Sequence, residues 1–380
     1  MATLATISGL FILAAILWDS FETIILPRRV TRRVRLARGY YRFTWFPWRA
    51  VARRMRSAKR RDSFLSYYGP LSLLGLFGVW AVGLIVGFAL LHWAAGSVIN
   101  PMPNELVTFR TDLYFSGTNF FTLGLGDIAP RTPLARVITV AEAGTGFGFL
   151  AIVISYLPVL YGAFSRREVN ISLLDARAGS PPTVMELLRR NAQSNNLGRL
   201  GQYLGDWESW AAELMESHLS YPVLCYFRSQ HNNQSWLAAL TTVLDACALI
   251  MAYGEGECRW QARLTFAISR HALVDLAQTF SVPPHPAPVD RLPPQDLERL
   301  QGLLVAAGMP LRRSTEADQK LEHLRSMYEP FAHGLSERLL LVLPAWFAAE
   351  KAVDNWRTSA WGRANLELTA SRRSVDEEHA

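Results

Sequence analysis

The chain has 380 residues, half of them hydrophobic, and a formal net charge of +7. That length and apolar content allow a membrane domain and a second domain outside the membrane. The charge is concentrated, because fourteen Lys and Arg residues and no acid lie between Arg28 and Arg61. A basic cluster between two apolar segments is typical of a cytoplasmic membrane loop and argues against a folded nucleic-acid-binding domain. We therefore expect no nucleic-acid partner.

The first apolar segment, Leu4 to Leu26, is long enough to span a bilayer. No basic residue precedes it and arginines follow at once, so we expect the N-terminus outside and the next loop inside. Asp19 and Glu22 lie near the inner end of this segment. There they would meet headgroups and neighbouring arginines, or alternatively contact the pore domain.

The basic segment, residues 28–63, is expected to contain an interfacial helix. After Pro47, apolar residues recur at helical spacing while arginines fall on other faces. Such a helix either anchors the chain passively or binds anionic lipid and so modulates gating. Membrane lipid is therefore an expected partner, with anionic lipid as the more specific hypothesis.

Two further apolar segments, Leu71 to Ala95 and Leu134 to Phe164, complete three predicted spans. Gly83 and Gly87 give the earlier of the two a small-residue face for close helix packing. Between these segments, Asp112 to Phe121 predicts a short helix that re-enters the membrane from outside.

The stretch Thr122-Leu123-Gly124-Leu125-Gly126-Asp127 follows that short helix. Its alternating glycines allow successive backbone carbonyls to point the same way, which steric clashes forbid in an ordinary loop. Rings of such carbonyls, one loop from each of four chains, replace the water shell of a monovalent cation. Because one loop cannot surround an ion, this arrangement requires a closed homotetramer. Asp127 places a carboxylate just outside, where it raises the local cation concentration.

This stretch and its flanks resemble the pore of the potassium-channel family. Thr122 to Asp127 match the filter of that family, Pro130 stands three residues on, and Gly146 stands where the family has its hinge glycine. The resemblance covers about residues 64–167. It implies an outer helix, a pore helix, a filter and an inner helix that pass K⁺ down its gradient without a cofactor. K⁺ would be bound by oxygens of Thr122, Leu123, Gly124 and Leu125.

Two filter residues depart from the family pattern. Leu123 replaces valine conservatively, and Leu125 replaces a tyrosine whose hydroxyl braces the filter in the family. The sequence thus predicts a potassium-selective channel, with a non-selective monovalent cation channel as the alternative. A further alternative from another class is a membrane-tethered interaction protein with a non-conducting pore module.

Two residues of the third span are candidates for a gating hinge. Gly146 lies mid-span, next to two further glycines, and Pro158 removes one helical hydrogen bond nearer the inner end. A pore-lining helix that bends to open and close needs such weak points.

Glu142 is a third gating candidate, because it lies about two turns inside the same helix. A carboxylate at that depth faces protein or water and needs a partner. We expect that partner to be Thr118, Asn119 or Arg136. Glu142 is then either a brace behind the filter or a proton-sensing gate.

Residues 168–366 predict an all-helical cytoplasmic domain that regulates or assembles the channel. Leu237 to Ala252 forms a largely apolar core helix in this domain, and six prolines in the segment 282–294 divide the domain into two lobes. We find no nucleotide-binding fingerprint and no catalytic His–Glu spacing, so we expect no enzyme. Three cysteines without metal-ligand spacing indicate reduced thiols. An unknown cytoplasmic ligand or partner stays open.

Together these features predict an all-α membrane protein with three transmembrane helices, a re-entrant pore loop and a helical cytoplasmic domain. Arg166 and Arg167 would close the third span on the cytoplasmic side. We expect a multi-pass protein of the plasma (inner) membrane with its N-terminus outside. The predicted divisions are residues 1–27, 28–63, 64–167, 168–366 and a disordered tail at 367–380.

Overall fold

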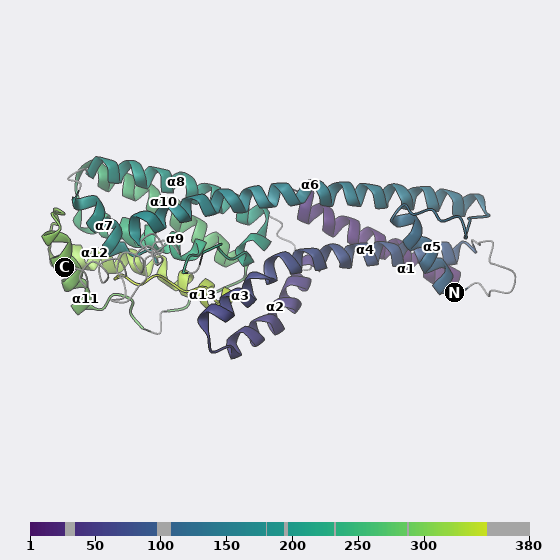
Figure 1. Ribbon diagram of the computed structural model, residues 1–380, viewed down its shortest axis with the longest axis horizontal. Helices are drawn as coiled ribbons and strands as arrows, with labels where there is room; N and C mark the ends of the chain where they lie inside the picture. Colours follow the sequence, from purple (N-terminus) through teal and green to yellow (C-terminus); the bar gives the residue numbers. More distant parts are fainter. Residues whose placement is uncertain are drawn as a thin grey trace, which may run out of the picture. The chain divides into compact units, whose positions relative to one another are not determined.

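The computed structural model describes residues 1–26, 35–96, 108–179, 181–193, 197–231, 233–286 and 289–347. Every regular element in these ranges is helical, which confirms the predicted all-α class. The chain divides into two compact units, the first ending at Ala163 and the second beginning at Phe164 (Figure 1). The predicted tail and the polar stretch at 97–107 lie outside the described residues.

The first unit is built from six helices and one π-helical turn. They are α1 (Ala2–Ser20), the π-turn η1 (Phe21–Ile25), α2 (Leu36–Arg54), α3 (Ala58–Ser66), α4 (Tyr68–Ala94), α5 (Phe109–Phe120) and the first part of α6 (Pro133–Ala178). The longest of these helices carry the three apolar segments that the sequence predicts as spans.

Helices α1 and α4 pack along a seam of glycines. A Cβ atom on Gly83 would lie 2.1 Å from Ile16 Cδ1, and one on Gly87 would lie 2.8 Å from the side chain of Leu13. On the α1 side, a Cβ atom on Gly9 would lie 2.8 Å from the Gly87 carbonyl oxygen. Small residues therefore allow the two backbones to approach closely, as the spacing of Gly83 and Gly87 predicts.

Asp19 and Glu22, near the end of the first apolar segment, have different partners. The Asp19 carboxylate is buried and accepts hydrogen bonds from the Trp80 indole N–H of α4 (3.0 Å) and the Ala37 backbone N–H of α2 (3.1 Å). Glu22 pairs with Arg35, with 3.5 Å between Oε2 and Nε. The headgroup-side interpretation therefore fits Glu22 but is wrong for Asp19, which contacts the outer helix.

Helix α2 begins well before the position that the sequence suggests. We expected a helix after Pro47, yet α2 starts at Leu36 and contains Pro47 in its interior. A proline inside a helix removes one backbone hydrogen bond, here to the Phe43 carbonyl. Burial of Trp45 and Ala52 on one face provides packing that offsets this loss.

Four helical segments in the described residues are long and apolar enough to cross a membrane: Ala2–Ile25, Ala58–Ala94, Pro133–Ala178 and Trp236–Tyr253. The first three contain the predicted spans. In the fourth segment, 89% of the apolar window is buried inside the protein, against 28–50% in the others. Helix length and composition alone therefore do not lead to the predicted number of three membrane spans.

The second unit contains the end of α6 and seven further α-helices with one 3₁₀ turn. These are α7 (Val184–Gln193), α8 (Leu197–Ser220), the 3₁₀ turn η2 (Pro222–Tyr226), α9 (Trp236–Tyr253), α10 (Gly256–Thr279), α11 (Pro294–Ala306), α12 (Thr315–Ser326) and α13 (Glu329–Leu339). Helix α9 is buried on all sides and packs against α10 and α12, among others. The predicted apolar core helix at Leu237 to Ala252 therefore lies at the centre of this unit.

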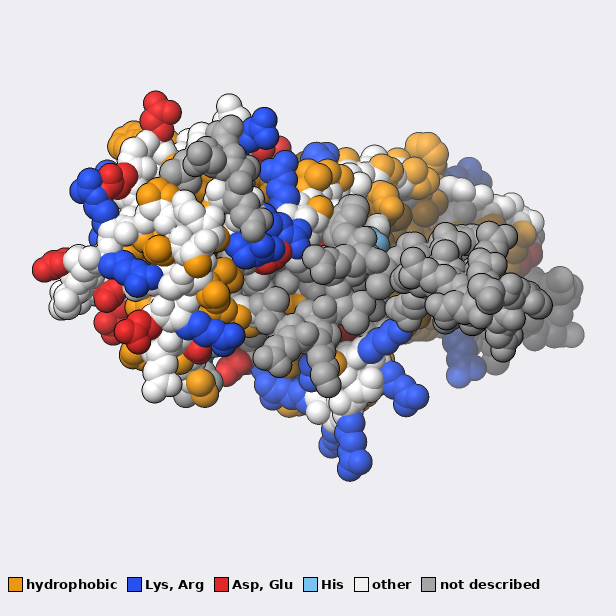
Figure 2. Space-filling view, turned by 60° about the vertical axis from the view of Figure 1, so that its left-hand side comes forward, with side chains coloured by type: hydrophobic (Ala, Val, Ile, Leu, Met, Phe, Trp, Pro, Cys, Tyr) orange, Lys and Arg blue, Asp and Glu red, His pale blue; other side chains and the backbone are white. Residues whose placement is uncertain are grey.

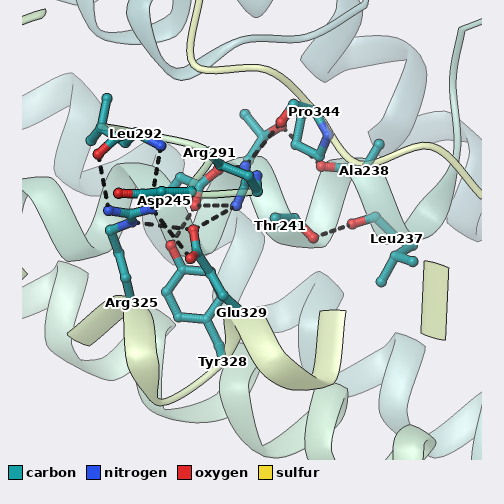
Figure 3. A network of polar contacts seen from close by, with 12 residues as sticks. Leu237, Ala238, Thr241, Asp245, Arg291, Leu292, Arg325, Tyr328, Glu329 and Pro344 are labelled. Atoms are coloured by element: carbon teal, nitrogen blue, oxygen red, sulfur yellow. Dashed lines mark hydrogen bonds and ion pairs between the residues drawn. The ribbon is translucent and has the colours of Figure 1, made fainter. Parts of the chain in front are cut away.

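A buried polar network joins α9 to Arg291 in the proline-rich stretch and to α12 and α13 beyond it (Figure 3). Asp245 of α9 accepts hydrogen bonds from Arg291 (2.5 Å to Oδ2) and from the Tyr328 hydroxyl. Arg291 also bonds Glu329 (3.0 Å), and Glu329 in turn pairs with Arg325 (3.2 Å). Burial, and then the charge of Asp245, raise the pKa of Tyr328 well above its ordinary value, so its hydroxyl stays a donor.

The proline-rich segment therefore does not separate two lobes in the way that the sequence suggests. Helix α11 contacts α7, α12 contacts α9, and α13 contacts α10. Prolines end helices, but they do not prevent the chain beyond them from returning to the same core. Arg291, which lies within the proline-rich segment, pairs directly with Asp245 of α9.

Arg167 lies in the second unit rather than at a membrane boundary. Helix α6 continues to Ala178, beyond the predicted end of the third span at Phe164. The Arg167 side chain is buried, and its guanidinium donates to the backbone carbonyls of Leu224 and Phe227, at 2.9 Å each. Arg166 is exposed, so only one of the two arginines has the environment that we expected.

Candidate functional site

The candidate site begins with α5, the short helix before the glycine-containing loop. Thr108 precedes the helix in an extended conformation and forms a capping box with Thr111, in which the Thr108 backbone N–H donates to Thr111 Oγ1 (3.2 Å). The helix extends three residues further toward the N-terminus than predicted. It ends at Phe120, directly before the loop, so its negative dipole end and the loop are adjacent in the chain.

The loop from Thr122 to Asp127 has the alternating backbone that its glycines predict. Positive φ angles occur at Thr122 (55°), Gly124 (53°) and Gly126 (78°), and the residues between them do not share this sign. A Cβ atom on either glycine would meet nothing within 4 Å. Glycine is therefore required at these positions by backbone conformation, and not by lack of space within one chain.

Three hydrogen bonds connect this loop to α5, the first from the Thr122 backbone N–H to the Asn119 carbonyl (3.0 Å). The Leu123 backbone N–H donates to the Thr118 carbonyl (2.8 Å), which fixes the start of the loop. The Tyr114 hydroxyl donates to Asp127 Oδ2 (2.9 Å), which fixes its end. A spacing of thirteen residues across a loop does not reveal such a contact in the sequence.

The side chains of the loop are exposed in a single chain. Leu123 and Leu125 each expose 61% of their surface, although both are large and apolar. Exposed apolar side chains beside each other usually mark an interface. The loop therefore has the surface expected of a segment that other protein copies or a membrane cover.

Gly146 lies where α6 crosses the end of α5. A Cβ atom there would be 2.0 Å from the Phe120 carbonyl oxygen and 2.8 Å from its carbonyl carbon. The Phe120 and Phe149 rings pack beside this crossing, with 5.8 Å between centroids. Close packing thus explains this glycine by itself, and α6 is continuous through Gly146 and Pro158. Their role as hinges stays a prediction.

Glu142 is fully buried, and its partners differ from those expected from the sequence. Its Oε2 lies 3.1 Å from Nε2 of His92 on α4, and its Oε1 contacts the hydroxyl of Ser116 on α5. The same hydroxyl lies 2.7 Å from the Ile85 carbonyl oxygen of α4. Glu142 therefore joins three helices, α4, α5 and α6. We call the trio of Glu142, His92 and Ser116 the clamp.

Thr118, Asn119 and Arg136, the partners proposed for Glu142, lie elsewhere. Thr118 donates to the Phe115 carbonyl (2.9 Å), and Arg136 Nε contacts the Pro130 carbonyl at 3.4 Å. The prediction failed because it considered α5 and α6 but not α4, which supplies His92. A histidine in the last turn of an apolar span was the signal that the sequence offered.

Asp112 is a second buried carboxylate next to the clamp. It is fully buried in the first turn of α5, where the helix dipole favours a negative charge, and it interacts electrostatically with His92. Neither of its carboxylate oxygens has a hydrogen-bond partner among the described residues. No local pattern in the sequence singles out Asp112.

The buried His218 of the second unit has a structural partner. His218 Nε2 accepts a hydrogen bond from Arg167 Nη1 (3.1 Å), and burial, followed by the charge of Arg167, lowers the pKa of His218 well below its ordinary value. Within the described residues, no group of three or more His, Cys, Asp or Glu side chains is placed to hold a metal ion. The Arg228 guanidinium donates to the Leu339 and Leu340 carbonyls.

Comparison with known proteins identifies the region around this loop. Residues 76–160 match a family model described as an ion channel, which confirms the predicted resemblance over that segment. The chain is also 27% identical over 243 residues to the "Uncharacterized membrane protein YdjJ" of Bacillus subtilis (strain 168), covering 62% of this chain and 69% of that protein. No solved structure matches.

Proposed function

From the ion-channel domain at residues 76–160, we propose that four copies of this chain form a potassium-selective channel. Backbone oxygens of Thr122, Leu123, Gly124 and Leu125, with the Thr122 hydroxyl, would bind K⁺ in place of its water shell. Transport would be passive and would need no cofactor or catalytic residue.

The observation that carries this proposal is the backbone of the loop. Alternation of positive φ angles at Thr122, Gly124 and Gly126 turns successive peptide units in the way that a ring of carbonyl ligands requires. Three hydrogen bonds to α5 hold this conformation, at Thr122, Leu123 and Asp127. A loop that only connects two helices needs neither the alternation nor the braces.

The tetramer follows from the geometry of ion coordination. One loop presents carbonyls from one side only, so several copies must meet around a central axis. The exposed Leu123 and Leu125 side chains, and exposed apolar residues along α6 such as Val140 and Phe147, provide surface for these contacts and for lipid. A single chain is therefore an incomplete site.

The proposed topology places the N-terminus outside and the second unit in the cytoplasm. Basic residues between α1 and α4 favour the cytoplasmic side, and the spans then place the glycine-containing loop toward the outside. The plasma (inner) membrane is the proposed location. Gly146, Pro158 and Glu142 are the proposed gating residues, with Glu142 holding the pore helix α5 from behind.

A non-selective cation channel is the second candidate, and one observation favours it. Leu125 has no hydroxyl, so the brace at Asp127 must hold the filter without the help that tyrosine gives in the family. A less rigid ring would discriminate less between K⁺ and Na⁺.

Recording from purified protein in planar bilayers, with K⁺ on one side and Na⁺ on the other, tests the proposal. A reversal potential far from zero, in the direction set by K⁺, is expected. A reversal potential near zero overturns the selectivity and favours the second candidate. The matched variants are Gly124→Ala, which should abolish the current, and Gly144→Ala, whose added Cβ meets nothing within 4 Å in the single chain.

A further inference from the structure

We propose that α2 binds anionic phospholipid headgroups of the inner leaflet through Arg38, Arg42 and Arg53, with Phe43 and Phe46 inserted among the acyl chains. The inference concerns a surface that the conduction pathway does not use. It does not rest on potassium selectivity, because lipid binding can be measured on a protein that passes no ion.

The orientation of α2 is fixed by the face that packs against the rest of the first unit. Trp45 is 2% exposed and lies 4.7 Å from the ring of Tyr68, between centroids. Trp48 stacks on Phe64 of α3 at 4.5 Å. Ala52 is fully buried, one turn further on. These contacts leave the opposite side of the helix without a protein partner among the described residues.

The opposite side carries large apolar side chains. Phe43 exposes 81% of its surface and Phe46 exposes 76%. At 100° per residue, these two phenylalanines lie about 60° apart and face away from Trp45 and Ala52. A helix with apolar residues on two separate faces uses one for the protein core and has the other available for a second apolar environment.

Exposed arginines form a stripe directly beside that outer apolar face. Arg38, Arg42 and Arg53 are exposed, and on the helix they fall within about 60° of one another, next to Phe46. An apolar face beside a basic stripe is typical of a helix that lies in the plane of the membrane interface.

An anionic lipid surface fits this stripe better than a protein partner, because the charge is all of one sign. From Arg35 to Arg61 the chain contains ten Lys and Arg residues and no acid. Lys and Arg side chains likewise gather at the lower edge of the view in Figure 2. A protein partner would need a matching acidic surface, whereas phosphodiester groups beside acyl chains supply both charge and apolar contact. The proposed membrane span α4 begins at Tyr68, shortly after α2 ends at Arg54, so the chain itself keeps α2 close to the membrane surface.

The contacts of α2 also connect this surface to the outer helix. Asp19 accepts the Ala37 backbone N–H in the first turn of α2 and the Trp80 indole N–H of α4. Further along, the Tyr40 hydroxyl approaches α4 so closely that a Cβ atom on Gly75 would lie 2.2 Å from it. A lipid that holds α2 in place therefore also restrains α4, against which the pore helix α5 packs.

The test uses the full-length protein reconstituted in vesicles of phosphatidylcholine with a trace of spin-labelled lipid. Electron paramagnetic resonance gives the association of spin-labelled phosphatidylglycerol relative to spin-labelled phosphatidylcholine. The stripe variant replaces Arg38, Arg42 and Arg53 by Gln. The control variant replaces Arg56, Lys59 and Arg60 by Gln, which removes the same charge from exposed positions outside α2.

Wild-type protein should prefer phosphatidylglycerol, and each stripe arginine should contribute roughly fivefold to that preference. The stripe variant should lose the preference and the control variant should keep most of it. If both variants lost the phosphatidylglycerol preference equally, any basic residue near the membrane would suffice for it, and the proposed site on α2 would be wrong. No preference in the wild type would overturn it as well.

The double variant Phe43→Ser/Phe46→Ser identifies the occupant of the apolar face. If lipid occupies it, the protein should keep its oligomeric state in size-exclusion chromatography and show a weaker phosphatidylglycerol preference. Dissociation of the oligomer with an unchanged preference would assign the face to a second copy of the chain and overturn the proposal.

Discussion

Replacement of Glu142 by Ala should loosen the pore helix, because the Glu142 carboxylate is the part of the clamp that bonds both other members. In the tautomer with hydrogen on Nε2, His92 donates to Oε2 over 3.1 Å, and Ser116 contacts Oε1. Glu142→Ala removes the acceptor that lies 3.1 Å from His92 Nε2, whereas Ser116 can still donate to the Ile85 carbonyl at 2.7 Å.

The expected cost follows from the loss of that one buried acceptor. A buried donor without a partner costs about 1–3 kcal/mol. In a unit of this size, 1 kcal/mol corresponds to a shift of roughly 2–4 °C in melting temperature, so Glu142→Ala should melt about 2–12 °C lower. Glu142→Gln should stay within about 2 °C of wild type, because its amide can accept from His92 and donate to Ser116.

Thermal unfolding and K⁺ flux of the reconstituted protein measure the two consequences. Glu142→Ala should lower both the melting temperature and the flux, and Glu142→Gln should restore both. If Glu142→Ala melts and conducts like wild type, the clamp does not hold the pore helix. Recordings of Glu142→Gln across pH separate the proton-sensing alternative, which requires a change in open probability or in its pH dependence.

Three further predictions concern other parts of the chain. Gly124→Ala should cost about 1–2 kcal/mol per subunit at a positive φ and abolish selective current, whereas Gly144→Ala should not. Asp245→Ala should destabilise the second unit by about 3–5 kcal/mol in calorimetry, because it removes the buried carboxylate that pairs with Arg291 and accepts from the Tyr328 hydroxyl, while exposed Asp206→Ala should be near neutral. The lowered pKa of His218 means that the unfolded chain binds a proton that the folded unit excludes. Stability of the second unit should therefore fall as pH drops below about 6.5, and His218→Gln should flatten this slope.

Much of the first unit could be predicted from local patterns in the sequence. The spacing of Gly124 and Gly126 predicts where the loop has positive φ angles, because glycine is the residue that adopts a positive φ at no steric cost. The small-residue spacing of Gly83 and Gly87 likewise anticipates close packing. These features depend on residues near one another in the chain, so a sequence shows them directly.

Contacts between distant residues could not be predicted in the same way. His92 and Glu142 are fifty residues apart, and their contact depends on how α4 packs against α6. Asp19 lies at the end of an apolar segment, where headgroups are the usual partners, but Trp80 and the start of α2 lie closer. Hydropathy likewise does not distinguish an exposed arginine from Arg167, whose buried guanidinium donates hydrogen bonds to backbone carbonyls.

The apolar character of α9 has a consequence for how the chain is made. During synthesis α9 leaves the ribosome before α10 to α13, which later cover it, and it is long and apolar enough for the insertion machinery to accept as a span. Insertion would reverse the side on which everything after it lies. Asp245, close to the middle of α9, makes insertion less favourable by about 2.5–3.5 kcal/mol. The carboxylate that Arg291 later neutralises thus first acts as a topology signal, marking an apolar segment as one to be folded and not to be inserted.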